Sequence, residues 1–528
     1  MADRGLSGRR RTPGVLLAWL VWALWLLGLP LLLLGLALLF GIVFVQDYKD
    51  RIAEVASELI DREVRIESIR IVPRAPLGVA LVLSGVEVVA GDPAGSFHLR
   101  DLRLDVDLLR TLAAQALVPD GVRIVGLDGM VSRDADGVLR IVGFIPGGGR
   151  LRPDLILADG DVEIRDSTLV WRGPDGEEQP FRIDALTLSD EGSDRVVEGR
   201  LALPAGWGDE VRVGLRWPGP DASAPSVPPE RIDWTLSAPA VRIGSFAGVA
   251  DSGSGLRLVG LSASGSLGSP ALPWPVPEAL AGPAGPLRLS GTVELTADGV
   301  EFEQDAVFPN VLTADGLDTG LVWQWDTAGW QLTVPRLRIS HALGMISGRG
   351  RLEGGDGSAR IDLDLDLDGN DDNLAGVANV LPLGVMGPRL GGWLVGAFST
   401  GHLRSAGLRW RGPLPGGPDA GPADLLSFQA RLEDARLDYR SGWPSLEAVT
   451  AGLTVTDTGL VIEAERGRVG SVALDGVRAD LAAYTEGLLE VDGAFSGEGD
   501  DLLALLQTLP PIPDPVIRTI RGFRLSGR

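Results

Sequence analysis

A metal site is the first chemistry that the sequence suggests, at residues 361–373, which read IDLDLDLDGNDDN. Four of these residues follow the spacing of the first half of an EF-hand calcium loop: Asp364, Asp366, Asp368 and Gly369. The twelfth loop position should supply a bidentate glutamate, but this chain has Ala375 there. The eighth position is Asp371 instead of an aliphatic residue. The sequence therefore argues against a calcium site.

The same residues alternate with a period of two, which is typical of a β-strand with two chemically different faces. One face carries the aspartates, which a strand holds about 7 Å apart instead of gathering them around an ion. The other face carries aliphatic residues: Ile361, Leu363, Leu365 and Leu367. We expect the acids to point toward water and the aliphatic residues toward a groove. Lipid and a second layer of protein are both open as contents of that groove.

Residues that could catalyse a reaction are sparse. The chain has no cysteine and only three histidines, the isolated His98, His341 and His402, so thiol nucleophiles and cysteine-based zinc sites are excluded. The segment GLSASG at 260–265 lacks the second glycine of a nucleophile elbow, and GRGRLE at 348–353 lacks the last glycine of a dinucleotide-binding loop. We interpret both as turns. We expect no enzyme activity, no cofactor and no metal, with a pair of glycosidase carboxylates as an open alternative.

The charge of the chain argues against a nucleic-acid partner. Its formal net charge is −23 at pH 7, whereas binding to phosphate backbones requires a basic surface. Four arginines gather instead in a short N-terminal tail, residues 1–14, followed by an uncharged run.

That uncharged run covers residues 15–45 and predicts a transmembrane helix. Aromatic residues near its basic end, where an interfacial belt belongs, and one internal proline complete the expected anchor: Trp19, Trp22, Trp25 and Pro30. The run is longer than the apolar region of a cleaved signal peptide, and no small-residue cleavage site precedes residue 46. The basic tail predicts a cytoplasmic N-terminus, with the rest of the chain across the membrane.

A short amphipathic helix is expected directly after the anchor, at residues 48–62, because its apolar residues recur with helical spacing. Two placements are open for it: on the membrane surface, or as a cap on the apolar end of the structure that follows. We favour the cap, since the polar face of the helix is mixed in sign instead of basic.

From about residue 64 the period changes to two, and more than a dozen alternating segments end at Gly, Pro, Asp or Asn turns. We predict an all-β fold: a long, curved and twisted sheet with an open hydrophobic groove, short helical insertions and one N-terminal transmembrane helix. The expected regions are a cap with first strands at 46–150, a β-groove at 151–370, a helical insertion at 371–400 and a continued groove at 401–528. The candidate lining residues are Leu102, Leu104, Val106, Leu332, Val334, Ile361, Leu363, Leu365 and Leu367.

Several segments resemble the AsmA-like family, and in particular its YhdP branch. ASELIDREVRIESIRI and the strands that follow, with an Asp-Gly turn at residues 136–137, are similar to the N-terminal region of AsmA-like proteins. The motifs LP, WL and YRSGWP follow in the order and spacing of the YhdP branch. They supply the family-motif positions Leu381, Pro382, Trp393, Leu394, Tyr439, Trp443 and Pro444.

The resemblance implies a bridge-like lipid transfer protein of the bacterial envelope. Such a protein is anchored in the inner membrane, lies mostly in the periplasm and lets phospholipid acyl chains move along an apolar sheet toward the outer membrane. The expected partners are phospholipids, the inner membrane and outer-membrane or envelope proteins. Since YhdP-like proteins are considerably longer, we expect a short or truncated member. A membrane-anchored scaffold that assists outer-membrane assembly without carrying lipid, and an anchored hydrolase, are the alternatives.

Overall fold

The structure is a computed structural model of the chain. It describes residues 48–60, 62–74, 78–89, 97–108, 110–111, 119–133, 139–142, 161–172, 178–219, 231–242, 254–268, 289–305, 307–326, 329–355, 358–370, 374–384, 388–414, 421, 423–438, 442–482 and 490–508. The chain divides into two compact units, residues 1–190 and 191–528.

The first unit is an antiparallel sheet with one helix and one parallel strand pair. Its strands pair in the order β1, β2, β3, β4, β6 and β7; β4 and β6 run parallel, and β5 pairs with β4. Its elements are α2 (Lys49–Ile60), β1 (Glu63–Arg74), β2 (Gly78–Val89), β3 (Phe97–Asp107), β4 (Pro119–Arg133), β5 (Leu139–Val142), β6 (Asp161–Arg172) and β7 (Glu178–Glu191).

Helix α2 covers the apolar side of the first strands. Its Ile52, Ala53 and Ala56 pack against a buried cluster from β1, β2 and β3 that includes Ile69 and Val86. The helix therefore packs against the start of the sheet; its role as a cap stays a prediction.

The second unit contains most of the strands and the remaining helices. The strands are β8 (Asp194–Ala202), β9 (Glu210–Pro218), β10 (Arg231–Arg242), β11 (Ser254–Gly268), β12 (Leu289–Ala297), β13 (Gly299–Gln304), β14 (Leu312–Ala314), β15 (Gly316–Asp326), β16 (Gly329–His341), β17 (Gly344–Gly355), β18 (Ser358–Gly369), β19 (Phe398–Pro413), β20 (Leu425–Leu437), β21 (Leu446–Thr456), β22 (Leu460–Val469), β23 (Val472–Leu481) and β24 (Glu490–Ser496). The helices are η5 (Leu374–Asn379), α5 (Pro388–Ala397) and α6 (Gly499–Thr508).

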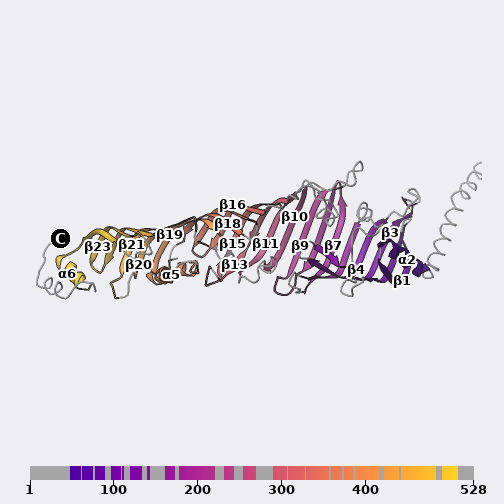
Figure 1. Cartoon of the computed structure of the whole chain (residues 1–528), viewed down its shortest axis with the longest axis horizontal. Coiled ribbons are helices and arrows are strands. Elements are labelled where there is room, and N and C mark those ends of the chain that lie inside the picture. The colour runs from indigo at the N-terminus through magenta and orange to yellow at the C-terminus, as the bar shows by residue number, and fades with distance from the viewer. Residues whose placement is uncertain are drawn as a thin grey trace, which may run out of the picture. The chain divides into compact units, whose positions relative to one another are not determined.

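The sheet of the second unit follows the order of the chain, as the labels in Figure 1 show. From β8 to β12 and from β15 to β24 each strand pairs antiparallel with the next. Strand β12 pairs with β15, and β13 and β14 form a side branch on β11. Among the described strands of this unit, β8 does not pair back onto β24, so the sheet is open.

Local irregularities in the strands follow from proline and glycine. The register between β16 and β17 shifts between Val334 and Leu337, at a bulge that contains Pro335. Proline has no backbone N–H for the ladder, so a bulge is one of the few strand positions that accepts it. At Gly260 in β11 the backbone has a φ of +61°, a conformation that favours glycine.

The interpretation of GLSASG and GRGRLE as turns is wrong, because the structure places them inside β11 and β17. Both segments suggest turns because glycine is a common turn residue. In β11, Gly260 has a positive φ within a strand that keeps its register with β10, and in β17 the glycines alternate with arginines along the strand.

The predicted all-β class and open sheet are confirmed, and η5 and α5 lie within the predicted insertion at 371–400. The predicted anchor at 15–45 lies outside the described residues. Among the helices that the structure describes, none combines the length and the hydropathy needed to cross a bilayer.

Candidate functional site

The candidate site is one side of the sheet from β16 to β22, which we call the apolar face. Cross-strand pairing aligns its residues in four rows. Row A contains Leu332, Leu352 and Ile361; row B contains Val334, Gly350, Leu363, Trp410 and Leu426; row C contains Leu337, Gly348, Leu365, Leu408, Phe428, Val455 and Leu460; row D contains Ile339, Ile346, Leu367, Ala406, Ala430, Leu453 and Ile462.

Much of the apolar face is uncovered by protein. On β18, each of the four aliphatic side chains of the IDLDLDLD segment is only partly buried. Their row neighbours Leu408, Trp410 and Phe428 on β19 and β20 are partly buried as well. Aliphatic side chains in a protein core are normally close to fully buried. On β16 to β19, the described residues therefore leave rows A to D partly exposed. Farther along the sheet, row members on β20 to β22 are buried: Ala430, Leu453, Val455 and Leu460.

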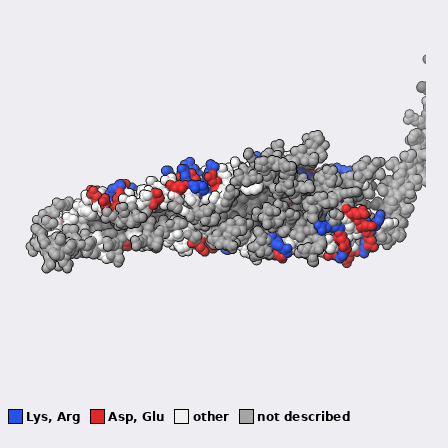
Figure 2. Space-filling model, viewed as in Figure 1, with Lys and Arg blue, Asp and Glu red and all other residues white. Residues whose placement is uncertain are grey.

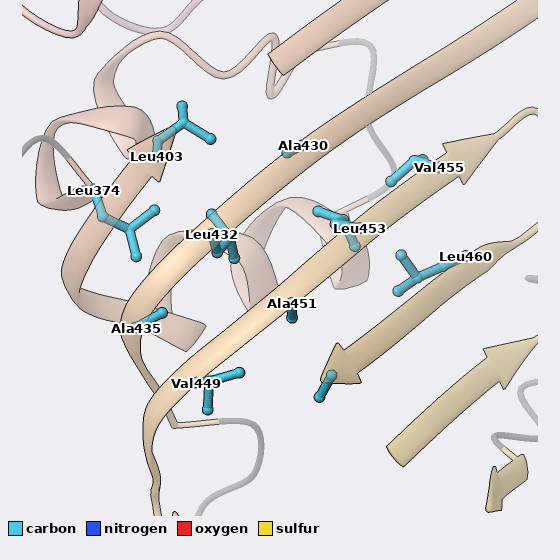
Figure 3. Close-up of a cluster of buried hydrophobic side chains, with 11 residues drawn as sticks. Leu374, Leu403, Ala430, Leu432, Ala435, Val449, Ala451, Leu453, Val455 and Leu460 are labelled. Carbon is cyan, nitrogen blue, oxygen red and sulfur yellow. The ribbon is translucent and has the colours of Figure 1, made fainter. Parts of the chain in front are cut away.

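The row D end of the face is closed by the helical insertion (Figure 3). Leu374 of η5 joins a buried cluster with Leu403, Leu432 and Ala435, whose exposures are 3%, 4%, 4% and 0%. Trp393 of α5 packs against this cluster and makes an edge-to-face contact with Phe398, with ring centroids 6.0 Å apart. The insertion thus forms a wall along one edge of the apolar face.

Strand β17 contributes glycine to rows B and C, and the neighbouring leucines fill the space. A Cβ on Gly348 would lie 2.5 Å from Cδ2 of Leu365, and one on Gly350 would lie 3.3 Å from Cδ1 of Leu363. Both leucine side chains therefore lean across β17. As a result, the centre of the face is smooth and aliphatic.

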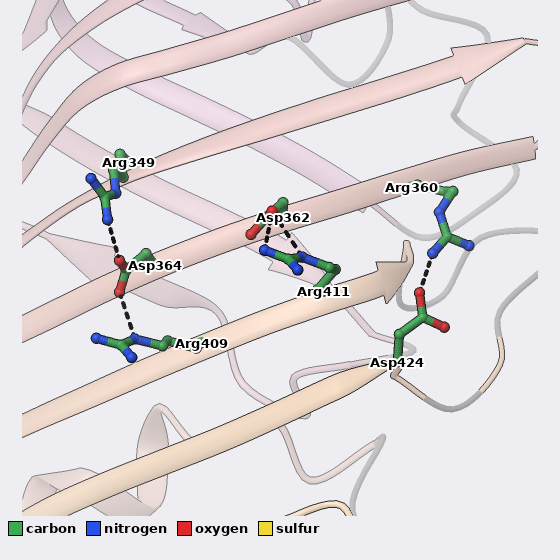
Figure 4. A network of polar contacts seen from close by, with 7 residues as sticks. All are labelled: Arg349, Arg360, Asp362, Asp364, Arg409, Arg411 and Asp424. Carbon is green, nitrogen blue, oxygen red and sulfur yellow. Dashed lines mark hydrogen bonds and ion pairs between the residues drawn. The ribbon is translucent and has the colours of Figure 1, made fainter.

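The opposite side of the same strands, which we call the polar face, holds the aspartates of β18. Asp364 accepts a hydrogen bond from Nη2 of Arg349 on β17 at 3.0 Å and one from Nε of Arg409 on β19 at 3.4 Å (Figure 4). Asp362 accepts a hydrogen bond from Nε of Arg411 at 3.0 Å. The aspartates lie away from the apolar face, as predicted, but two of them are held by arginines instead of only by water.

Further ion pairs extend this pattern across neighbouring strands: Arg336–Asp318, Arg336–Glu294, Arg431–Glu465, Arg478–Glu463 and Arg404–Glu433. The hydrogen bond from Arg404 holds the pKa of Glu433 below its ordinary value, and Arg431 lowers the pKa of Glu465 in the same way. Figure 2 shows the result as clusters in which both signs of charge are mixed. Such a surface stays hydrated without forming a basic patch for nucleic acid.

The predicted lining residues fall into two groups. Leu102, Leu104 and Val106 lie on β3 of the first unit, where Leu102 and Leu104 pack against the α2 cluster and Val106 is buried. The six others lie in rows A to D of the second unit: Leu332, Val334, Ile361, Leu363, Leu365 and Leu367.

The described family-motif residues lie in the helical insertion or shortly before β21. Leu381 and Pro382 follow η5, Trp393 and Leu394 belong to α5, and Trp443 and Pro444 precede β21. Tyr439 and the anchor residues Trp19, Trp22, Trp25 and Pro30 lie outside the described residues.

The residues of β19 that lie beside the β18 residues on the apolar and polar faces were not identified from the sequence. Trp410 and Leu408 of the apolar face, and Arg409 and Arg411 of the polar face, all come from the segment LRWRG of β19. The alternation of arginine with apolar residues in this segment was a usable signal. Among the described residues, no group of acidic and histidine side chains is placed to hold a metal ion.

A comparison with protein families gave a match within the second unit. The family model described as YhdP protein matches residues 285–514, which include all of rows A to D and the wall. This region of the chain is similar to the YhdP family. The match confirms the expected YhdP branch of the AsmA-like proteins. Comparisons with curated proteins and with solved structures gave no match.

Proposed function

We propose that this chain carries phospholipid on the apolar face of its second unit, between the inner and outer membranes of a bacterial envelope. In this proposal the residues 15–45 anchor it in the inner membrane, and the bulk of the chain lies in the periplasm. The observation that carries the proposal is the partial burial of the aliphatic side chains of rows A to D on β16 to β19, in a sheet that is open. Similarity to the YhdP family supports it.

The energetics of lipid movement explain why such a face is useful. Exposing acyl chains to water costs about 0.8 kcal/mol of free energy per CH2 group. Moving a phospholipid with about thirty methylenes from a bilayer into water therefore costs roughly 24 kcal/mol. A continuous aliphatic surface offsets much of that cost. It does so without directional bonds, so the lipid remains free to move from one strand to the next. The ion pairs of the polar face keep the other side of the sheet in water.

Photo-crosslinking in living cells tests the proposal. A photoreactive phenylalanine analogue is placed at Leu363 in row B, and as a matched control at Met345 of β17, an exposed apolar residue on the polar face. We expect phospholipid adducts, identified by mass spectrometry, at Leu363 and not at Met345. Equal labelling at both positions contradicts the proposal. No lipid adduct at Leu363 favours a scaffold that carries no lipid.

A further inference from the structure

All described tryptophans in the strands of the second unit lie near one edge of the sheet. The end of β9, the start of β10, the end of β15, the start of β16 and the end of β19 meet there, and they carry Trp217, Trp234, Trp323, Trp325, Trp330 and Trp410. Pairing of Trp323 with Leu332 and of Trp410 with Leu363 places these indoles on the same side as rows A and B. We call this border the indole edge.

The indoles of this edge are accessible and lie over neighbouring strands. Trp325 and Trp330 pair with each other and are 40% and 39% exposed. A Cβ on Gly354 would lie 2.6 Å from Cζ2 of Trp330, and one on Gly291 would lie 2.7 Å from Nε1 of Trp323. Each ring therefore occupies the space that a paired glycine leaves empty, an arrangement in which an aromatic ring covers a strand glycine.

The border of the apolar face opposite the indole edge differs from it in residue type and in burial. It is formed by row D and closed by the wall, where Leu403, Leu432 and Ala435 are buried beneath η5 and α5. Burial along β20 increases in this direction, from the partly buried Leu426 and Phe428 to the buried Leu432 and Ala435. One border of the apolar face is thus aliphatic and is buried where the wall covers β19 and β20, and the other is partly exposed and rich in indole.

The difference between the two borders matches the difference between the two ends of a phospholipid. Indoles prefer the interface between hydrocarbon and water, because the ring is apolar and its N–H can donate to an ester or phosphate oxygen. The width also agrees: Ile361 in row A and Leu367 in row D are six residues apart on β18, which is about 20 Å along a strand. One leaflet of bilayer hydrocarbon is about 15 Å deep.

We infer that bound phospholipid lies along the strands, with its glycerol esters and headgroup at the indole edge and its acyl ends toward the wall. This inference rests on the proposed function and adds an orientation to it. Headgroups then project beyond the sheet border, so the face selects for acyl chains and tolerates different headgroups. Lipids move sideways from strand to strand while keeping this orientation.

Fluorescence quenching by spin-labelled lipids tests the orientation. The 528-residue chain has no cysteine, so single cysteines introduced into it can be labelled with bimane. Ala359→Cys lies at the indole edge opposite Gly354, and Ala406→Cys lies in row D opposite Leu367. Both alanines are partly buried on the apolar face, which makes them a matched pair. Ser347→Cys on the polar face measures background quenching.

Each labelled protein is reconstituted in phosphatidylcholine nanodiscs that contain lipid with a nitroxide either on the choline headgroup or at the terminal acyl carbon. We expect the headgroup label to quench Ala359→Cys more than Ala406→Cys, and the acyl label to reverse that order. Quenching above background that is equal at both sites, or in the opposite order, overturns the orientation while leaving lipid binding intact. Quenching no greater than at Ser347→Cys with either lipid overturns both the orientation and the proposed function.

Discussion

Replacement of Leu365 by aspartate is the most informative perturbation of the apolar face. Leu365 lies in row C, between Gly348 on β17 and Leu408 on β19, and its side chain leans over β17. An aspartate here places a carboxylate where the proposal puts acyl chains. An aspartate in the middle of bilayer hydrocarbon costs about 2.5 to 3.5 kcal/mol on insertion scales. Lipid occupancy at this position should therefore fall roughly 100-fold.

The structure also selects the control. Asp366 is the next residue on β18, lies on the polar face between Ser347 and Gly407, and makes no ion pair with a described residue. Asp366→Asn removes one charge from the exposed side and leaves the apolar face unchanged. Asp362 and Asp364 are poorer controls, because their loss also breaks ion pairs with arginines of neighbouring strands.

The assay is the rate at which full-length protein moves a fluorescent phospholipid between donor and acceptor vesicles, with thermal unfolding measured alongside. We expect Leu365→Asp to lower the rate strongly while the protein stays folded, since the side chain it replaces is only partly buried. Asp366→Asn should match the wild type. Equal loss of transfer in both variants, or none in either, refutes the assignment of the two faces.

Three other perturbations follow from the contacts. Gly348→Val should destabilise the protein by about 1 to 3 kcal/mol in chemical denaturation, because its Cβ meets the Asp364 carbonyl oxygen at 2.5 Å; an unchanged midpoint contradicts the packing of β17. Asp364→Ala should cost no more than about 1 kcal/mol per ion pair lost, less at high salt, and a larger, salt-independent loss contradicts an exposed pair. Arg431 lowers the pKa of Glu465 in the folded protein. The contribution of this ion pair to the free energy of unfolding should therefore be present above the pKa that Glu465 has in the unfolded chain, and should disappear as pH falls through the pKa of Glu465 in the folded protein. Glu465→Gln should remove that part of the acid dependence of unfolding, and identical acid profiles contradict it.

The division of β18 into an acidic and an aliphatic face was predictable from eight residues. A period of two fixes which side chains share a face, and no long-range information is needed. The insertion at 371–400 was predictable for a similar reason, since the alternation stops there and small and apolar residues follow.

The ion-pair partners and the closed border were not predictable from the sequence. Which arginine meets Asp364 depends on the register of β17 and β19, and a shift of one residue would move every side chain to the other face. The wall depends on where the chain returns after Gly369, which brings Leu374 onto strands that lie far along the sequence. In β17, glycines that suggested a turn proved to be strand residues that make room for leucines of β18.

The most direct test of the central claim is the phospholipid content of the natively purified full-length protein, measured by mass spectrometry against a Leu363→Asp, Leu365→Asp double variant. Lipids around the proposed anchor at residues 15–45 would be common to both proteins and cancel in the comparison. If the apolar face carries lipid, the wild type should retain more phospholipid per chain than the equally folded variant. Equal phospholipid content in the two proteins contradicts the account.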